Sequence, residues 1–474
     1  LASPQPRQRT WPVGENTTLA SYLKEVAAHA PSFTTARSRT HCANVQVHAI
    51  VRAHALGSAS PGARAARLEV SHVQQDVDFI VASSTVGCVA NLIAIAYGQR
   101  IARPEYGNQQ IRLAVKGAVL LTVILSAILT LCFAYAPQLL ALAKQPQELA
   151  GPAMEYLDAL KWAMLPSLML LVLRGLTSAL GNVRSIMVMS LLTVALNVPI
   201  SYLLAFQLEL GLAGLGAGTA LAAFIVMLGY GYWVFKRPEY KPFAPWKNTE
   251  EYSLSLLKPL LAMGLPIALA ALLEHGLIYG GTLMAGTISI AALALHQILL
   301  QCLSFTWNIN FGFSQAAAIL VGQDYGAEDY DGIKRTALRS FGLTTVISVV
   351  LAGVFMLWPE LIGSIFNLDS ELSTLLVAVL WVVALSFIVD AWQLLAINLL
   401  RGMKIVVGPT VVTAVGYWLF GLPAAWLLLP DFGLGGIWGG IGIGLGVTGV
   451  LLLVQLLLAI KKQRNTDSLA VAMG

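Results

Sequence analysis

Charged residues are scarce in this chain. Asp, Glu, Lys and Arg make up 11% of its 474 residues, whereas 57% are hydrophobic. Soluble domains carry about 25% charged residues. A chain this long and this apolar cannot bury its hydrophobic surface in one aqueous core, which excludes a soluble protein and indicates a lipid bilayer as its solvent. The net charge of +5 does not indicate nucleic-acid binding, because the basic residues lie between hydrophobic segments.

Cysteines and enzyme motifs are also lacking. The four cysteines form no CxxC pair, so neither a disulfide framework nor a zinc site is indicated. The HExxH and GxSxG patterns of hydrolases and the GxxxxGK[ST] loop of ATP-driven pumps are absent. We therefore expect a protein that is not an enzyme, holds no cofactor and does not hydrolyse ATP.

Long apolar runs dominate the sequence. A membrane-spanning helix needs about 20 mostly apolar residues. About eleven runs meet this requirement, which predicts an all-α integral membrane protein. They are Phe79–Tyr97, Gly117–Ala136, Tyr156–Leu173, Ile186–Phe206, Gly214–Phe235, Pro259–Met284, Ile290–Val321, Phe341–Trp358, Leu375–Leu400, Pro409–Leu429 and Gly433–Ile460.

Lys and Arg residues gather in alternate loops between these runs. The other loops hold only Lys144 and Lys161, together with acidic residues. Because cytoplasmic loops carry an excess of Lys and Arg, the basic set predicts the cytoplasmic side, a cytoplasmic C-terminus and an inner (plasma) membrane location. The basic set is Arg100, Arg103, Arg112, Lys116, Arg174, Arg184, Lys236, Arg237, Lys241, Lys247, Lys258, Lys334, Arg335, Arg339, Arg401, Lys404, Lys461, Lys462 and Arg464.

Short motifs recur after about 222 to 227 residues. Tyr97-Gly98-Gln99 returns as Val321-Gly322-Gln323, and Leu173-Arg174-Gly175 returns as Leu400-Arg401-Gly402. A second half with six spans implies two parallel six-helix bundles related by an axis along the membrane normal. The expected organisation is helices at 79–235, a cytoplasmic linker at 236–258, helices at 259–460 and a cytoplasmic tail at 461–474.

The N-terminal segment, residues 1–78, breaks this repeat. The position equivalent to the first helix of the second half falls near Ala36–Ser60, where arginines and histidines interrupt the sequence. Arg at a helix centre costs about 2.5–3.5 kcal/mol of insertion free energy. Two interpretations stay open: an out-of-frame sequence has replaced the first helix, or the chain carries a genuine polar extension.

Two carboxylates lie within the predicted spans. Glu274 and Asp390 each fall within about 5 Å of the centre of their helices, at 1.5 Å per residue. Acids at this depth usually face a bundle interior or a cavity. We expect them to bind a coupling cation, and to act as metal ligands if that cation is Na⁺. An acid hydrogen-bonded between helices is the structural alternative.

Several uncharged polar side chains share these spans and could line a pathway. His296 could move protons, and Tyr279 could stack on a flat cation. Amides at mid-span either line a pathway or bridge helices, and packing explains each of these residues equally well. The candidate cavity residues are Tyr279, His296, Asn308, Asn310, Gln315 and Gln393.

The repeat, the GQ motif after the second helix of each half and the LRG motif after the fourth resemble the multidrug and toxic compound extrusion (MATE) family. Ala291–Gln297 (AALALHQ) also fits it. Glu274 and Asp390 match the acids of the family's seventh and tenth helices, as in the NorM-like branch. The resemblance implies a V-shaped monomer that exports organic cations in exchange for Na⁺ or H⁺.

Two other functions share this architecture. A lipid-linked oligosaccharide flippase would need basic residues inside its cavity to hold phosphate, whereas the mid-span charges here are acidic. An inactive remnant with a damaged N-terminus is the other alternative. Neither a nucleic-acid partner nor an enzymatic reaction is expected.

Overall fold

The chain is helical throughout the part that the structure describes. The structure is a computed structural model, and it describes residues 80–134, 155–156, 158–366, 368 and 370–473. No strand forms among these residues, and ten helical segments are long and apolar enough to cross a membrane. The predicted all-α membrane fold is confirmed. The anomalous segment 1–78 lies outside the described residues.

The helices of residues 80–236, here called the first lobe, follow the first five apolar runs. α5 begins at Pro104 rather than at the predicted Gly117, and Glu251 of the linker pairs with Arg112 and Lys116 in this added part of the helix. The bounds are α4 (Val89–Ala102, continuing a span from Ile80), α5 (Pro104–Ala134), α8 (Met164–Ala179), α9 (Val183–Tyr202) with the π-helix η2 (Leu203–Gln207), and α10 (Gly211–Lys236).

The helices of residues 257–462, here called the second lobe, include one very long segment. Val407–Lys462 is a continuous helical segment of 56 residues. At 1.5 Å per residue its length would be about 84 Å, more than twice the thickness of the bilayer core. The backbone breaks at Gly433, where φ is 53°, so this segment crosses twice, as predicted. The bounds are α11 (Leu257–Ile288), α12 (Ile290–Gly326), α13 (Tyr330–Leu357), α14 (Pro359–Phe366), α15 (Ser370–Gly402), α16 (Val407–Ala414), η6 (Val415–Gly421) and α17 (Leu422–Met473).

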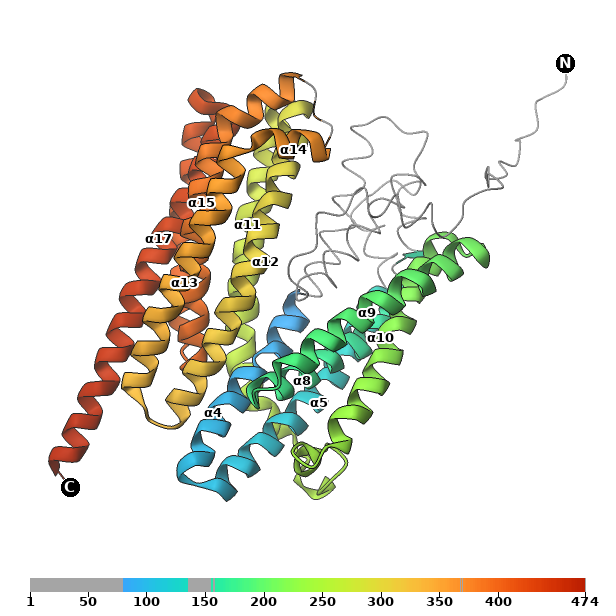
Figure 1. Ribbon diagram of the computed structural model, residues 1–474, viewed down its shortest axis with the longest axis vertical. Coiled ribbons are helices and arrows are strands. Elements are labelled where there is room, and N and C mark those ends of the chain that lie inside the picture. The colour runs from blue at the N-terminus through green and yellow to red at the C-terminus, as the bar shows by residue number, and fades with distance from the viewer. Residues whose placement is uncertain (1–79, 135–154, 157, 367, 369, 474) are drawn as a thin grey trace, which may run out of the picture.

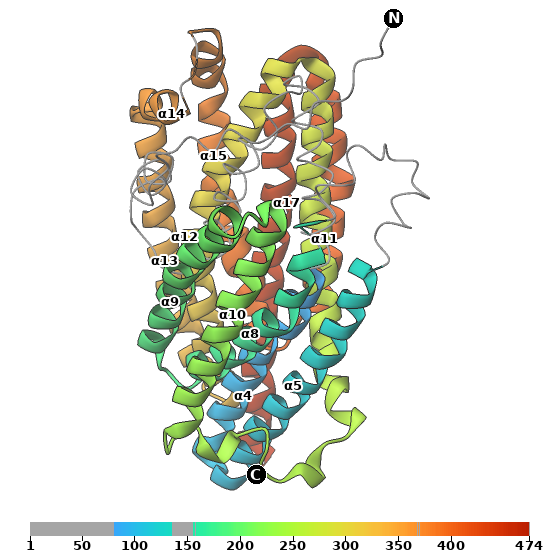
Figure 2. The ribbon, with the colours of Figure 1, turned by 90° about the vertical axis from the view of Figure 1, so that its right-hand side faces the viewer.

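The two lobes meet at one end and diverge toward the other (Figure 1). The view turned by 90° places the helices of the first lobe in front of the second lobe (Figure 2). The lobes join through α4 and α12, which pack against each other along the end that holds their GQ motifs. The arrangement is the V shape that the family resemblance implied.

Two glycines, Gly98 of the first GQ motif and Gly326 just after the second, make this seam very close. A Cβ atom placed on Gly98 would lie 2.9 Å from the backbone nitrogen of Ala327 and closer still to the carbonyl oxygen of Gln323. A Cβ atom on Gly326 would meet the carbonyl oxygen of Ile95 in the same way. Gly98 and Gly326 therefore allow backbone to touch backbone between the lobes.

The linker between the lobes is fastened to α5 by charges. Glu251 accepts hydrogen bonds from Arg112, with 2.8 Å from its Oε2 to Nε, and from Lys116, with 2.7 Å to Nζ. Nζ of Lys116, which is fully buried, also donates to the carbonyl oxygen of Asn248. The hydrogen bonds from the Arg112 guanidinium, with a smaller contribution from Lys116, lower the pKa of Glu251 to about 2. We call these four residues the linker clasp.

Candidate functional site

Glu274 lies near the middle of α11, on the part of that helix that packs beside the π-helix η6. The indole of Trp418 in η6 donates a hydrogen bond of 3.3 Å to the carbonyl oxygen of Leu273. Gly276 allows this approach, since a Cβ there would lie 2.7 Å from the Trp418 ring. The carboxylate itself accepts a hydrogen bond from Trp307 of α12. Three helical elements thus fix the position of Glu274.

Asp390 enters the same region from α15 and is 3% exposed. It lies within electrostatic range of Glu274, although the two acids are more than 100 residues apart in sequence. α12 packs against both α11 and α15 and holds the two acid-bearing helices together. The structure therefore brings the two predicted acids into one interior region of the second lobe.

This region also contains two residues that the sequence analysis did not assign to the site. Tyr417 in η6 is fully buried and interacts electrostatically with both acids and with Arg401. Arg401 was predicted as a cytoplasmic loop charge, but it lies in the last turn of α15 and interacts with Glu274. The LRG motif could have indicated Arg401, whereas nothing in the apolar sequence around Tyr417 sets it apart.

Hydrogen bonds hold Arg401 in place through the two helices that flank it. Its Nη1 donates to Oδ1 of Asn398 at 3.3 Å, and Nδ2 of Asn398 donates to Oγ of Ser314 at 3.1 Å. Asn398 is 1% exposed and Ser314 is 1% exposed. α12 and α15 are thus joined by a polar chain that ends at a guanidinium.

Unsatisfied oxygen atoms mark the same region. Within the described residues, the Tyr417 hydroxyl and Oε1 of Gln393 are buried and have no hydrogen bond of good geometry. The two side chains are neighbours. Because Tyr417 and Gln393 also interact with each other, they form a polar pair that adds oxygen atoms to the region of the two acids. Gln393 was a predicted cavity residue, and the structure places it here.

The other predicted cavity residues lie elsewhere in the second lobe. His296 is fully buried, contacts Thr282 Oγ1 at 3.2 Å, and its ring lies 5.5 Å from that of Trp438. Oδ1 of Asn310 accepts a hydrogen bond of 3.3 Å from Ser348 on α13. These two residues join helices of the second lobe.

Three further predicted residues lie on α11 and α12. Nδ2 of Asn308 donates to the Ser304 carbonyl one turn earlier. The Tyr279 ring lies 6.4 Å from that of His275, on the same helix. Gln315 is half-buried on α12. The predicted set of eight thus contains one compact group, made of Glu274, Asp390 and Gln393.

The charges of this group do not balance. Two carboxylates face one guanidinium, so the region carries one excess negative charge when both acids are ionised and the neighbouring His275 is neutral. An uncompensated charge at this depth costs about 3 kcal/mol. A proton or a bound cation would neutralise the excess charge and remove that cost. One of them is sufficient, because the excess is a single charge.

Comparison with known proteins decides the family. The family model described as MatE matches residues 79–203 and 266–427. The chain belongs to the MatE family. It is 29% identical over 399 residues to the "Probable multidrug resistance protein NorM" of Bradyrhizobium diazoefficiens, covering 81% of this chain and 84% of that protein. It is also 29% identical to the protein of the same name from Rhodopseudomonas palustris, over 84% of each chain.

Solved structures of this family share the fold. An outward-facing multidrug resistance MATE family transporter of the MOP superfamily superposes with a TM-score of 0.78 at 17% identity, covering 95% of this chain and all of that one. A MOP superfamily transporter from Pyrococcus furiosus, described as having a binding pocket of reversed polarity, also gives 0.78 at 16% identity. The predicted MATE membership and NorM likeness are confirmed, and this MATE protein is a membrane transporter rather than an enzyme.

Proposed function

We propose that this MATE transporter exports organic cations in exchange for Na⁺ or H⁺, coupled through Glu274 and Asp390. The observation that carries this proposal is the meeting of two intramembrane carboxylates beside one half-buried guanidinium and the polar side chains of Tyr417 and Gln393. The names of the NorM relatives support a multidrug substrate range.

The exchange follows from competition for one excess negative charge. An inward-moving Na⁺ or H⁺ satisfies the acids, and so does an organic cation, but the three exclude one another by charge. Na⁺ prefers several oxygen ligands, and the carboxylates, the Tyr417 hydroxyl and Gln393 Oε1 supply that chemistry. Binding of the coupling ion on one side therefore favours release of the drug there.

The guanidinium of Arg401 is a further positive charge that competes for the acids. Its guanidinium interacts with Glu274 but not, among the described residues, with a carboxylate at ion-pair distance. A cation that binds between the acids must compete with this interaction. We expect Arg401 to weaken cation binding and so to help release.

Orientation and assembly complete the proposal. The basic loops support a cytoplasmic C-terminus and a location in the inner (plasma) membrane. The lobes then meet at the cytoplasmic end, because Gly98 and Gly326 lie beside the basic loops, and diverge toward the outer side. We propose that the transporter acts as a monomer.

Efflux in proteoliposomes tests the coupling. The experiment loads a fluorescent organic cation and imposes a Na⁺ gradient or a pH gradient separately. We expect Glu274→Gln and Asp390→Asn each to lower ion-driven efflux at least tenfold at equal protein content. Glu360→Gln and Asp431→Asn, which remove exposed acids at the opposite end of the lobe from Lys334, should leave efflux unchanged.

Two results would overturn the proposal. One is ion-driven efflux that persists in both interior variants. The other is wild-type protein that responds to neither gradient but moves a lipid-linked sugar, which would favour the flippase function.

A further inference from the structure

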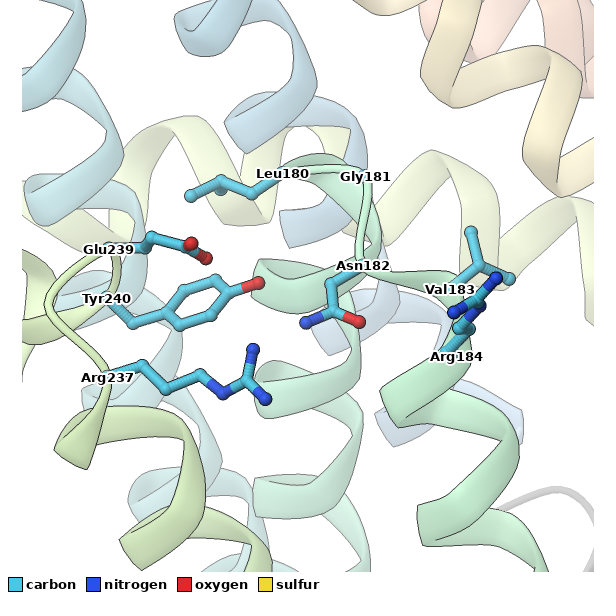
Figure 3. A pocket seen from close by; sticks show the side chains of 8 residues that line it. All are labelled: Leu180, Gly181, Asn182, Val183, Arg184, Arg237, Glu239 and Tyr240. Atoms are coloured by element: carbon cyan, nitrogen blue, oxygen red, sulfur yellow. The ribbon is translucent and has the colours of Figure 1, made fainter.

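A cavity of about 490 Å³ lies at the basic end of the first lobe, away from the acids of the second lobe. It opens where α8 ends and α9 begins, against the segment that follows α10 (Figure 3). Leu180 to Arg184 form one side, and Arg237, Glu239 and Tyr240 form the other. The transport proposal uses none of these residues.

Two guanidinium groups border the cavity on either side of Asn182 (Figure 3). The Cζ atom of Arg237 lies 4.1 Å from the centre of the Trp233 ring, which holds the side chain in place. Neither Arg184 nor Arg237 has an ion pair among the described residues. Figure 3 shows the Tyr240 ring between Arg237 and the carboxylate of Glu239. The two cations are thus free to meet an anion.

The base of the cavity is rigid. The Tyr240 side chain is 1% exposed and hydrogen-bonds with Asn182. Just inside it, the Tyr230 hydroxyl hydrogen-bonds with Thr177 and Ser185, each at 2.9 Å. Because the polar groups of the base already have partners, the arginines at the rim are the groups left to bind a ligand.

The cavity lies where three helical segments long and apolar enough to cross a membrane end or begin, at Ala179, Val183 and Lys236. Val183 and Tyr232 beside it are 60% and 69% exposed, on helices that cross the membrane. The ammonium of Lys236 lies 5.4 Å from the Tyr232 ring, a pairing typical of the membrane interface. A ligand that reaches the rim therefore has its apolar part beside apolar side chains.

The internal repeat shows that an arginine is not required by the fold here. Gly181 corresponds to Gly408 at the offset of the LRG motifs, and Arg184 then corresponds to Val411. Val411 is 57% exposed on α16. The second lobe thus presents an apolar residue to its surroundings where the first lobe presents a guanidinium.

We propose that this cavity binds the phosphate-bearing headgroup of an anionic membrane lipid. Two guanidinium groups and one carboxylate leave a net charge of +1 at the rim, which suits the single charge of a phosphodiester. Arginine binds phosphate oxygens with paired N–H donors. The apolar side chains beside the rim would contact the acyl chains. The proposal does not depend on the transport proposal.

Native mass spectrometry of the detergent-purified protein tests the site. We titrate phosphatidylglycerol, phosphatidylcholine and inorganic phosphate separately. We expect phosphatidylglycerol to bind, and R184Q/R237Q to bind it at least tenfold more weakly. The matched control K334Q/R339Q removes two exposed cations from α13 at the same end of the second lobe and should bind it as wild type does.

Each other result overturns the proposal. Equal affinity in R184Q/R237Q, or equal affinity for phosphatidylcholine, excludes an anionic headgroup site. Displacement of the lipid by millimolar phosphate would assign the cavity to a soluble anion. Because both arginines are exposed, the variant should fold, and an unchanged thermal unfolding midpoint without lipid verifies this. If that midpoint falls, the single variants R184Q and R237Q are titrated instead, and each must bind phosphatidylglycerol more weakly than wild type does.

Discussion

Gly98→Ala should push the transporter away from the conformation described here. The added methyl group would lie 2.9 Å from the Ala327 nitrogen and closer to the Gln323 carbonyl oxygen. Both are backbone atoms, so neither can turn aside as a side chain does. Overpacking of this kind costs about 1–3 kcal/mol. Because the contact joins the two lobes, the added methyl group raises the free energy of the conformation in which they touch at this end.

The size of the effect follows from this penalty. A cost of about 1–3 kcal/mol paid by one of two conformations shifts their ratio by about 5- to 150-fold. Double electron–electron resonance measures it, with spin labels on cysteines placed at Arg103 and Lys334 in a background without the native cysteines. We expect longer distances to gain population in Gly98→Ala and efflux to slow.

Gly229→Ala is the matched control, because nothing lies within 4 Å of a Cβ at Gly229 in α10. Its distance distribution should equal that of wild type. If Gly98→Ala leaves both the distances and the efflux rate unchanged, the seam does not govern the position of the lobes, and the reasoning is refuted.

Three further predictions concern stability, measured as thermal unfolding in detergent. Glu251→Gln should remove about 1–2 kcal/mol, since the carboxylate accepts charge-assisted hydrogen bonds, whereas Glu250→Gln should change nothing. The pKa of Glu251 is lowered to about 2, so the stability that its carboxylate contributes is complete above pH 4.5 and disappears as the pH falls toward 2. A difference in unfolding midpoint between wild type and Glu251→Gln that grows on acidification would contradict this. Tyr230→Phe should lower the free energy of unfolding by about 1–2 kcal/mol, because it removes two hydrogen bonds. An unchanged unfolding midpoint would show that neither hydrogen bond stabilises the fold. Gly433→Ala should cost about 1–3 kcal/mol at a positive φ, and Gly435→Ala, which has a negative φ and open space, should cost less.

Much of the fold could be predicted because lipid imposes simple rules. Apolar length located the spans, and the repeat located the GQ motifs that form the seam. Glu274 and Asp390 were recognisable because a charge in an apolar run is rare. These signals are local in sequence, so no structure was needed to find them.

The rest depended on which side chains meet in space. Arg401 looked like any basic residue after a span, and only its position at the end of α15 directs it to Glu274. Tyr417 is placed by a π-helix, for which the sequence gives no signal. The sequence also did not show that His296 hydrogen-bonds with Thr282 and packs its ring against Trp438.

The linker clasp changes what joins the two halves. Because Asn248 and Glu251 are bound to Arg112 and Lys116 of α5, the chain after residue 248 is already attached to the first lobe without its peptide bond. A break in the backbone before Asn248 would therefore leave the two pieces assembled. The attachment extends further along the chain, because the Tyr252 ring lies 5.4 Å from Nζ of Lys116 and a Cβ on Gly117 would lie 2.8 Å from the carbonyl oxygen of Leu256, so the start of α11 is held on the first lobe as well.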